Sequence, residues 1–278
     1  MVGSISIDRL HLVTGETVAA AGGAGLYTAL ALAAGGVATA LFAPHSEPAP
    51  EPLRAATAGL LQLGPRVPPG GLARLEIAHH GGGRATLVAA DWGAAARLEP
   101  EQLPERAAAV ETLHVAALPT PVQQRRFVAW AREHGVPRLS SGTFARAVEA
   151  DRGGVGELLA ACDAFFMNEN EARLLYGALD AVPRPPRGAV FVTRGRRGAR
   201  VLEPQRNSDV PAVDAEEIDP TGAGDAFCGA ALAALACGAD AVEAARAGAR
   251  LAAAVVAAVG PAALLRGPEH GVGYSSGR

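Results

Sequence analysis

The sequence predicts an α/β fold in which helices cover both faces of a mostly parallel sheet. One observation is that short segments rich in Val, Ile, Leu and Phe alternate with alanine-rich segments of helical length. Repeated strand–helix units of this kind build parallel sheets that are buried on both faces. A second observation is the length of 278 residues, which suits one large domain,. We therefore expect residues 1–278 to form a single domain.

The first third of the chain is expected to combine strand–helix units with one β-hairpin. A glycine turn separates an opening strand from the first helix, and Gly81-Gly82-Gly83 joins two extended runs. Extended runs around a glycine turn are typical of a hairpin. The expected elements are a strand at 2–7, a helix at about 25–34, a strand at 37–42, a helix around 53–63 and hairpin runs at 74–80 and 84–90.

The alternation resumes after the hairpin and ends in two alanine-rich helices. The helix expected at 121–134 carries Val122, Phe127 and Trp130 among its apolar positions. The other expected elements are strands at 112–116, 136–140, 164–167, 189–193, 200–203 and near 210–213, and helices at 155–161, 169–176, 222–237 and 239–259.

The charge composition excludes several classes of function. All 25 basic residues are arginine, because the chain contains no lysine. A P-loop of the GxxxxGK[ST] type, a Schiff-base enzyme and a protein-kinase phosphate site all need a lysine. The net charge of −3 gives no basic stripe, so we expect no nucleic-acid partner,.

The segment 17–46 is the one stretch long enough to be mistaken for a membrane span, because it has no Asp, Glu or Arg,. It is mostly Ala and Gly, and it is interrupted by Gly22-Gly23 and Gly35-Gly36. It is better divided into a buried helix and a strand. Asp8 and Glu16 stand where a secretory leader would be basic, and the three cysteines show no CxxC spacing,. We expect a cytoplasmic protein without a membrane partner.

The segment Asp219-Pro-Thr-Gly-Ala-Gly-Asp225 is the most informative stretch of the sequence. The backbone N–H groups of Gly222, Ala223 and Gly224 can converge on an anion at a helix N-terminus. Asp225 then falls in the first helical turn, where the helix dipole favours its ionised form. It could accept a proton from a hydroxyl that attacks a phosphoryl group. The alternative is a plain glycine turn in which Asp225 only caps the helix.

This segment resembles the C-terminal signature of the ribokinase-like, or PfkB, family of carbohydrate kinases. Four further matches lie in the family's order along the chain. They are the opening strand that ends in Asp8, the Gly-Gly helix at 22–36, the NxxE motif from Asn168 to Glu171, and the T-x-G-x-x-G turn of Thr193, Gly195 and Gly198. The resemblance implies a three-layer α/β/α sandwich with a central mostly parallel sheet. It also implies a small β lid, with elements at about 9–20 and 72–92.

The resemblance implies a role for each motif on the phosphate side. Asp225 would be the catalytic base, and the amides of Gly222, Ala223 and Gly224 would hold the transferring phosphoryl group. Asn168 and Glu171 would organise Mg²⁺ through its waters. The nucleotide-binding residues would be Asn168, Glu171, Thr193, Gly195 and Gly198. Asp219 is the candidate ligand of a monovalent cation such as K⁺.

Two of these motifs have other interpretations. The pattern N-x-x-E also fits a helix N-cap with a capping-box glutamate, and both roles can coexist in a cap that faces the ligand crevice. The arginines around the nucleotide turn could form a solvated hairpin edge, or one could reach the ATP phosphates in place of a lysine. These arginines are Arg194, Arg196, Arg197 and Arg200.

On the acceptor side, the resemblance assigns Asp8, Gly22 and Gly23 to substrate binding. Tyr27 is a further candidate, either as a wall on which the acceptor stacks or simply as a core residue. A lid over the acceptor would exclude water, which would otherwise hydrolyse ATP. The chain departs from the family at Tyr27, where an asparagine is usual, at the short segment between Asp8 and Gly22, and at Ser140-Ser141, where many relatives have an acidic residue. His79 and His80 point to opposite faces of a strand, so we expect them to flank a turn rather than to bind a metal together.

The expected function is transfer of the γ-phosphoryl group of ATP to a hydroxyl of a small sugar or related polyol, with Mg²⁺ as cofactor. A nucleoside or inositol kinase of the same family and a catalytically inactive ligand-binding relative are the alternatives. The presence of Asp225 and of the glycine anion hole argues against the inactive relative. A homodimer through the lid is the oligomer that the family suggests.

Overall fold

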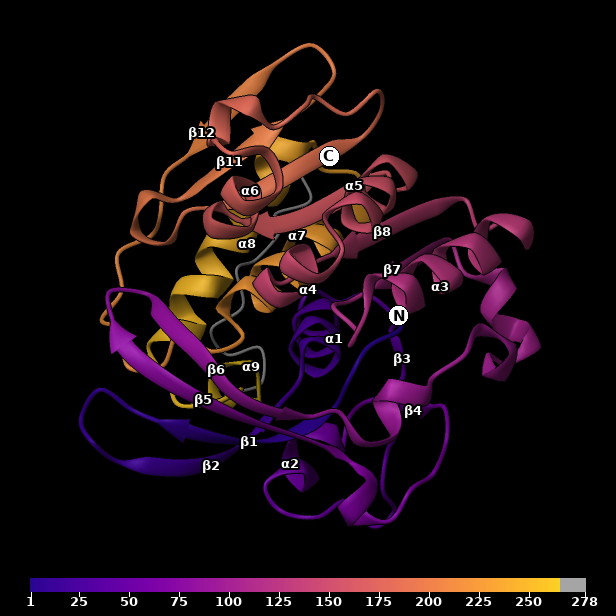
Figure 1. Cartoon of the computed structure of the whole chain (residues 1–278), viewed down its shortest axis with the longest axis vertical. Helices are drawn as coiled ribbons and strands as arrows, with labels where there is room; N and C mark the ends of the chain where they lie inside the picture. The colour runs from indigo at the N-terminus through magenta and orange to yellow at the C-terminus, as the bar shows by residue number, and fades with distance from the viewer. Residues whose placement is uncertain (266–278) are drawn as a thin grey trace.

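The computed structural model describes residues 1–265, and its largest element is a six-stranded sheet in the order β12-β11-β10-β9-β8-β7 (Figure 1). The strands are β7 (Thr112–Val115), β8 (Arg138–Gly142), β9 (Ala164–Asn168), β10 (Ala189–Thr193), β11 (Ala199–Leu202) and β12 (Asn207–Val210). β7 to β10 run parallel, and β11 and β12 are antiparallel additions at one edge. The predicted mostly parallel sheet is confirmed.

The sheet continues past β7 through a single residue of the opening segment. Val2 forms parallel bridges to Val115 and to Phe42 in β3 (Ala40–Phe42), which pairs with β4 (Leu61–Leu63). The strand predicted over 2–7 is therefore interrupted: Val2 forms isolated bridges, residues 3–5 are not in a strand, and Ser6 and Ile7 begin β1 (Ser6–His11). Gly3 crosses directly over helix α1 (Ala24–Ala34), where a Cβ would lie 2.5 Å from the Cα of Gly25, and the chain then leaves this sheet.

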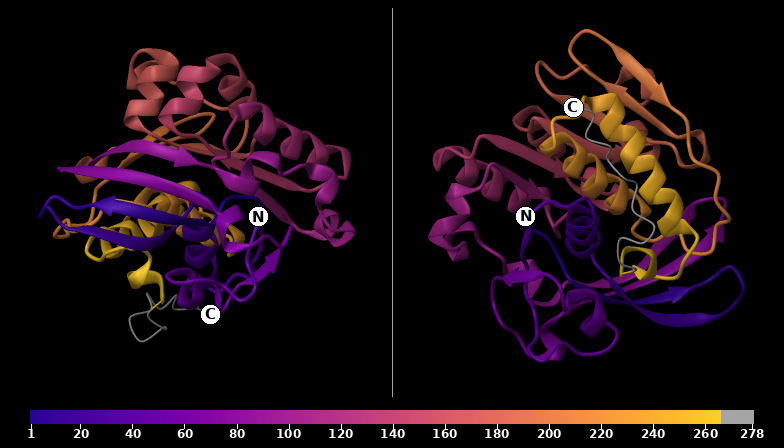
Figure 2. Two further views of the ribbon diagram at one scale, coloured as in Figure 1. Left: turned by 60° about the horizontal axis from the view of Figure 1, so that its bottom comes forward. Right: turned by 180° about the vertical axis from the view of Figure 1, so that it is seen from behind.

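Helices cover both faces of the sheet. On one face α3 (Pro121–Glu133), α5 (Arg152–Ala161) and α6 (Glu169–Tyr176) pack against β7 to β10, with α4 (Ala145–Ala150) beside them. On the other face α7 (Ala223–Ala236) and α8 (Ala241–Val256) contact β9, β11 and β12, and α1 packs on α7. Figure 2 shows this second layer from behind. The predicted three-layer α/β/α arrangement is confirmed, although α4 was not predicted.

The helix predicted around 53–63 is shorter than expected. α2 spans Leu53–Thr57, a turn closes when the Leu60 N–H donates to the Thr57 carbonyl, and Leu61–Leu63 then forms β4. The short helix α9 spans Ala262–Leu265. Among residues 1–265 no helix combines the length and the apolar character that a membrane crossing needs.

A second sheet of four strands, which we call the lid, lies beside the main sheet (Figures 1 and 2). Its order is β2-β1-β5-β6, with β1 (Ser6–His11), β2 (Thr17–Gly22), β5 (Ala73–Gly81) and β6 (Arg84–Asp91). β1 pairs antiparallel with β2 and parallel with β5. Both predicted lid segments thus lie in one sheet, and the short segment after Asp8 still builds a complete hairpin.

Candidate active site

A cavity of about 320 Å³ lies between the lid and the carboxyl ends of the main-sheet strands. It brings together nine of the residues that the sequence analysis selected: Asp8, Gly23, Tyr27, Asn168, Glu171, Thr193, Gly222, Gly224 and Asp225. Five other selected residues do not line it: Gly22, Gly195, Gly198, Asp219 and Ala223. The motifs of both halves of the chain therefore meet at one site.

The N-terminus of α7 lines this cavity. Gly222 is its N-cap residue, with a left-handed φ of 75° that a residue with a side chain rarely adopts,. Among the described residues, the N–H groups of Gly224 and Asp225 have no backbone acceptor, as expected in a first helical turn,. The N–H of Ala223 instead donates to the Pro220 carbonyl at 3.3 Å. The amides of Gly224 and Asp225 are thus the ones most available to an anion.

Asp225 lies in the first turn of α7, and its side chain is partly exposed to the cavity. The surrounding protein removes most of the water from this carboxyl, and this burial raises its pKa to about 7,. We expected the helix dipole to favour the ionised form, but burial of the carboxyl outweighs the dipole. A carboxyl with a pKa near neutral pH is well suited to accept a proton.

Asn168 and Glu171 form a complete capping box at the start of α6. The Asn168 Oδ1 accepts from the Glu171 N–H at 2.9 Å, and the Glu171 Oε2 accepts from the Asn168 N–H at 2.8 Å. The Glu171 Oε1 also accepts from the Asn168 Nδ2 at 2.6 Å. The interpretation of this motif as a helix cap is therefore confirmed, and the pair also lines the cavity.

The charge around Glu171 fits a divalent cation. Burial raises the pKa of Glu171 to about 8; hydrogen bonding from the Asn168 backbone opposes this shift, and the charge of Asp225 adds to it. Both carboxyls face one cavity, and a hard cation bound beside them would favour their ionised forms through its preference for oxygen ligands,. The residues present thus fit Mg²⁺ bound through water.

Asp219 is fully buried and braces the turn before α7. Its Oδ1 accepts from the Thr221 N–H and its Oδ2 accepts from the Gly260 N–H, both at 2.8 Å. These bonds tie the turn to the segment after α8. A carboxylate oxygen can accept further ligands, so a monovalent cation at Asp219 stays a prediction.

The predicted nucleotide turn follows β10. Thr193 ends the strand and lines the cavity, while Gly195 and Gly198 take left-handed φ values of 56° and 79° in the turn itself. The arginines of this turn are paired with acidic side chains. The pairs are Arg194 with Asp209, Arg196 with Glu217, Arg197 with Glu169, and Arg200 with Asp180 and Asp209.

Asp8 is the main polar group on the acceptor side. It lies within β1 of the lid sheet and not at the end of the opening strand as predicted, and it is 2% exposed. Its Oδ1 accepts from the Ser6 hydroxyl at 2.5 Å, and Gly22 leaves room for the carboxyl, since a Cβ there would lie 1.9 Å from Oδ2. Burial raises its pKa to about 7, the Ser6 hydrogen bond opposes the shift, and the charges of Asp219 and Asp225 add to it.

Tyr27 and the two serines, Ser140 and Ser141, depart from the family pattern, and all three side chains are buried. Tyr27 is 1% exposed, and its ring lies under Gly222. Its hydroxyl is buried without a partner among the described residues. Ser141 donates to the Val115 carbonyl at 2.7 Å, and the Ser140 hydroxyl lies 3.0 Å from His114 Nδ1, so both serines satisfy buried groups of the core.

The sequence analysis missed the apolar wall of the acceptor half of the cavity. Trp92 and Phe144 form an aromatic corner, with ring centroids 5.9 Å apart and planes inclined by 59°. Leu75, Ile77 and Leu87 of the lid complete this wall. Thr143 stands next to the corner, and its Oγ1 is buried without a partner among the described residues. The residues of this wall come from distant segments, so no local motif indicates them. The only signal in the sequence is that aromatic residues such as Trp92 and Phe144 are rare in this chain.

His79 was also missed as a site residue. Its Nε2 lies 2.8 Å from the Thr221 Oγ1 and 3.3 Å from the Asp219 Oδ1, whereas His80 contacts Thr86 on the other face of the strand. Burial lowers the pKa of His79, and the charge of Asp219 opposes this shift. The predicted separation of the two histidines onto opposite faces is confirmed.

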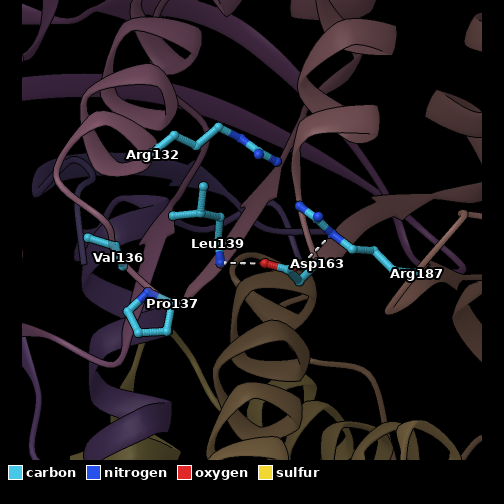
Figure 3. A pocket seen from close by; sticks show the side chains of 6 residues that line it. All are labelled: Arg132, Val136, Pro137, Leu139, Asp163 and Arg187. Carbon is cyan, nitrogen blue, oxygen red and sulfur yellow. Dashed lines mark hydrogen bonds and ion pairs between the residues drawn. The ribbon is translucent and has the colours of Figure 1, made fainter.

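A second cavity, of about 240 Å³, lies near the amino ends of β8, β9 and β10 (Figure 3). Asp163, just before β9, accepts from the Arg187 Nε at 2.7 Å and from the Leu139 N–H at 2.9 Å. Arg132 donates to the Ala161 carbonyl. Asp163 thus pairs with two other lining residues, and no residue that lines this cavity belongs to a motif of the predicted site.

Comparison with known proteins places the chain among kinases. The family model described as pfkB family carbohydrate kinase matches residues 69–266. A cytidine kinase of Thermococcus kodakarensis is 26% identical over 242 residues, which cover 84% of this chain and 86% of that protein. The solved structure of a probable sugar kinase from Rhizobium etli has a TM-score of 0.78 at 20% identity, and the match covers 94% of this chain and 93% of that kinase. A Burkholderia thailandensis nucleoside kinase in complex with inosine has a TM-score of 0.76 at 20% identity, and the match covers 96% of this chain and 93% of that kinase.

Proposed function

The chain belongs to the pfkB family of carbohydrate kinases, ATP-dependent phosphotransferases with a hydroxyl acceptor, and from that premise we propose that its acceptor is a nucleoside. The observation that carries this proposal is the apolar wall of the acceptor half of the cavity. A small sugar has hydroxyls on every side, and burial of a hydroxyl without a hydrogen bond costs free energy. A nucleobase presents an apolar face to such a wall and polar groups only at its edge.

The proposed orientation places the base and the sugar at different parts of the cavity. The base would lie against Trp92, Phe144 and the lid side chains, with the Thr143 hydroxyl as a partner for its edge. The ribose would turn toward Asp8, whose carboxylate can accept from two neighbouring hydroxyls. The cytidine kinase and the inosine-bound nucleoside kinase among the relatives support this class of acceptor.

Asp225 would act as the base. Its carboxylate accepts the proton of the acceptor hydroxyl as that oxygen forms a bond to the γ-phosphorus, and the bond from this phosphorus to the bridging oxygen of ADP breaks. The amides at Gly222, Gly224 and Asp225 would meet the negative charge on the transferring group. In a chain without lysine, these backbone donors take the place of a cationic side chain.

Thr193 and the turn of Gly195 and Gly198 would hold the nucleotide. Asn168 and Glu171 would hold the waters of Mg²⁺, which when bound neutralises charge on the phosphates. Asp219 remains the candidate ligand for K⁺. A cytoplasmic location is consistent with the use of ATP and with three free cysteines. A homodimer through the lid would cover Val13 and Val88, which are exposed there.

The experiment is an assay of ADP release with a panel of nucleosides, small sugars and inositols at a fixed ATP concentration. We expect nucleosides to give the highest kcat/KM, and we expect Trp92→Ala to lower it at least tenfold for nucleosides while any sugar turnover changes less. A preference for sugars that Trp92→Ala does not alter would overturn the nucleoside assignment. ATP binding without turnover of any acceptor would instead favour a ligand-binding relative.

A further inference from the structure

We propose that His79 is a positioning residue that latches the lid to the loop of the catalytic helix. The claim rests on the proposed function only in that the lid covers the acceptor. The latch itself consists of contacts between residues of the chain.

His79 reaches the catalytic loop from the lid strand β5. Its side chain is 0% exposed, and its Nε2 contacts the Thr221 hydroxyl at 2.8 Å and the Asp219 carboxylate at 3.3 Å. Thr221 directly precedes Gly222, the N-cap of α7. One lid side chain thus contacts the two residues that determine where the anion-binding amides lie.

A second contact joins the same hairpin to the same loop. The N–H of Gly83, at the hairpin tip, donates to both carboxylate oxygens of Glu217 at 2.8 Å. Glu217 also lies 3.7 Å from Arg196 in the predicted nucleotide turn. Figure 1 shows the tip of the β5–β6 hairpin beside the loop that leads from β12 toward α7. The loop at 217–221 therefore connects the lid, the anion-binding amides and the nucleotide turn.

The alternation of side chains along β5 couples the latch to the acceptor site. Residues two apart on a strand face the same side, and Leu75 and Ile77, which line the cavity, are followed on that face by His79,. When His79 reaches Thr221, these two side chains are held over the acceptor. The latch thereby fixes the distance between the lid wall and Asp225 and excludes water from the site.

The choice of atoms predicts which substitutions preserve the latch. Nε2 makes both contacts, whereas Nδ1 is buried without a partner among the described residues. A glutamine amide nitrogen can occupy the position of Nε2, but an asparagine amide reaches only to that of Nδ1. His79→Gln should therefore retain the latch, and His79→Asn and His79→Ala should lose it.

Hydrogen–deuterium exchange on the ligand-free full chain tests the latch without reference to any activity. We expect His79→Ala to speed exchange of the β5–β6 amides about fivefold or more, as the loss of a net hydrogen bond implies, with His79→Gln near wild type. The control is His80→Ala, on the exposed face of the same strand. Equal exchange in the His79→Ala and His80→Ala proteins would overturn the latch, even if the kinase assignment holds.

Kinetics separate positioning from general stability. We expect His79→Ala to raise the acceptor KM about fivefold or more and to increase ATP hydrolysis without acceptor, with rescue by His79→Gln but not by His79→Asn. If His79→Ala does not fold, Thr221→Val removes the same contact from the other side. An unchanged acceptor KM and unchanged hydrolysis in both variants would count against the proposal.

Discussion

The ring of Tyr27 lies directly under Gly222, so closely that a Cβ on Gly222 would fall 2.3 Å from the ring Cε1. A residue predicted to bind the acceptor therefore supports the loop predicted to bind the phosphoryl group. The two motifs are separated by almost 200 residues in the chain, and their contact fixes the geometry between the two halves of the site.

Gly222→Ala should lower kcat strongly. The new methyl group would collide with the Tyr27 ring, and an alanine at a φ of 75° adds strain of about 1–2 kcal/mol,. Both effects displace the anion-binding amides, so we expect kcat to fall by roughly two orders of magnitude. The control is Gly156→Ala in α5, where a Cβ meets nothing within 4 Å. Similar kcat values for the two variants would contradict the role of this contact.

The acceptor kcat/KM should depend on pH through two carboxyls. Burial raises the pKa values of Asp8 and Asp225 to about 7, and both must be ionised to accept protons or hydrogen bonds from the acceptor. Below pH 7 protonation removes these forms, so log kcat/KM should fall with a slope approaching two between about pH 7 and pH 5. Asp8→Asn should reduce this slope to one. A flat profile over the same range would contradict both assignments.

Thr143→Val should separate base recognition from stability. The Thr143 hydroxyl is buried and has no partner within residues 1–265, so its removal should leave the melting temperature unchanged or higher,. If the hydroxyl binds the base edge, the nucleoside KM should rise by about fivefold or more, and Thr143→Ser should retain the wild-type value. Steady-state kinetics and thermal unfolding of the same preparations check this. A wild-type KM in Thr143→Val would remove Thr143 from the site.

Glu171→Gln should raise the Mg²⁺ concentration needed for half-maximal activity several-fold. The substitution removes the negative charge of Glu171 but retains an oxygen that can accept from the Asn168 backbone, so the helix cap largely remains,. The control is Glu169→Gln in the same turn, whose carboxylate pairs with arginines instead. Mg²⁺ titrations that superimpose for the two variants would rule out a metal role for Glu171.

The sequence was sufficient for features whose chemistry is local. The segment from Asp219 to Asp225 encodes a glycine turn, a helix N-terminus and a carboxyl in the first helical turn, and the structure has these as predicted, except that the Ala223 N–H donates to the Pro220 carbonyl. The capping box at Asn168 and Glu171 is likewise local. The alternation of strand and helix segments in the sequence predicted the three layers, because each element must bury its apolar side chains against a neighbouring layer.

Other features depend on tertiary contacts that no local pattern specifies. The opening strand was predicted to end at Asp8, whereas the crossing of Gly3 over Gly25 directs the chain into the lid, where β1 continues past Asp8 to His11. The pKa of Asp225 follows from enclosure by distant segments rather than from its position in the helix. His79 was set aside because its strand gave no indication of the loop, 142 residues later, that it contacts.

The most direct test of the account is the turnover of Asp225→Asn with a nucleoside acceptor, measured beside its affinity for ATP. The amide has nearly the same shape as the carboxyl but cannot accept the proton. We predict that kcat falls by about three orders of magnitude or more while the ATP dissociation constant stays within about twofold of wild type. A kcat near the wild-type value, with ATP affinity intact, would contradict the assignment of Asp225 as the base.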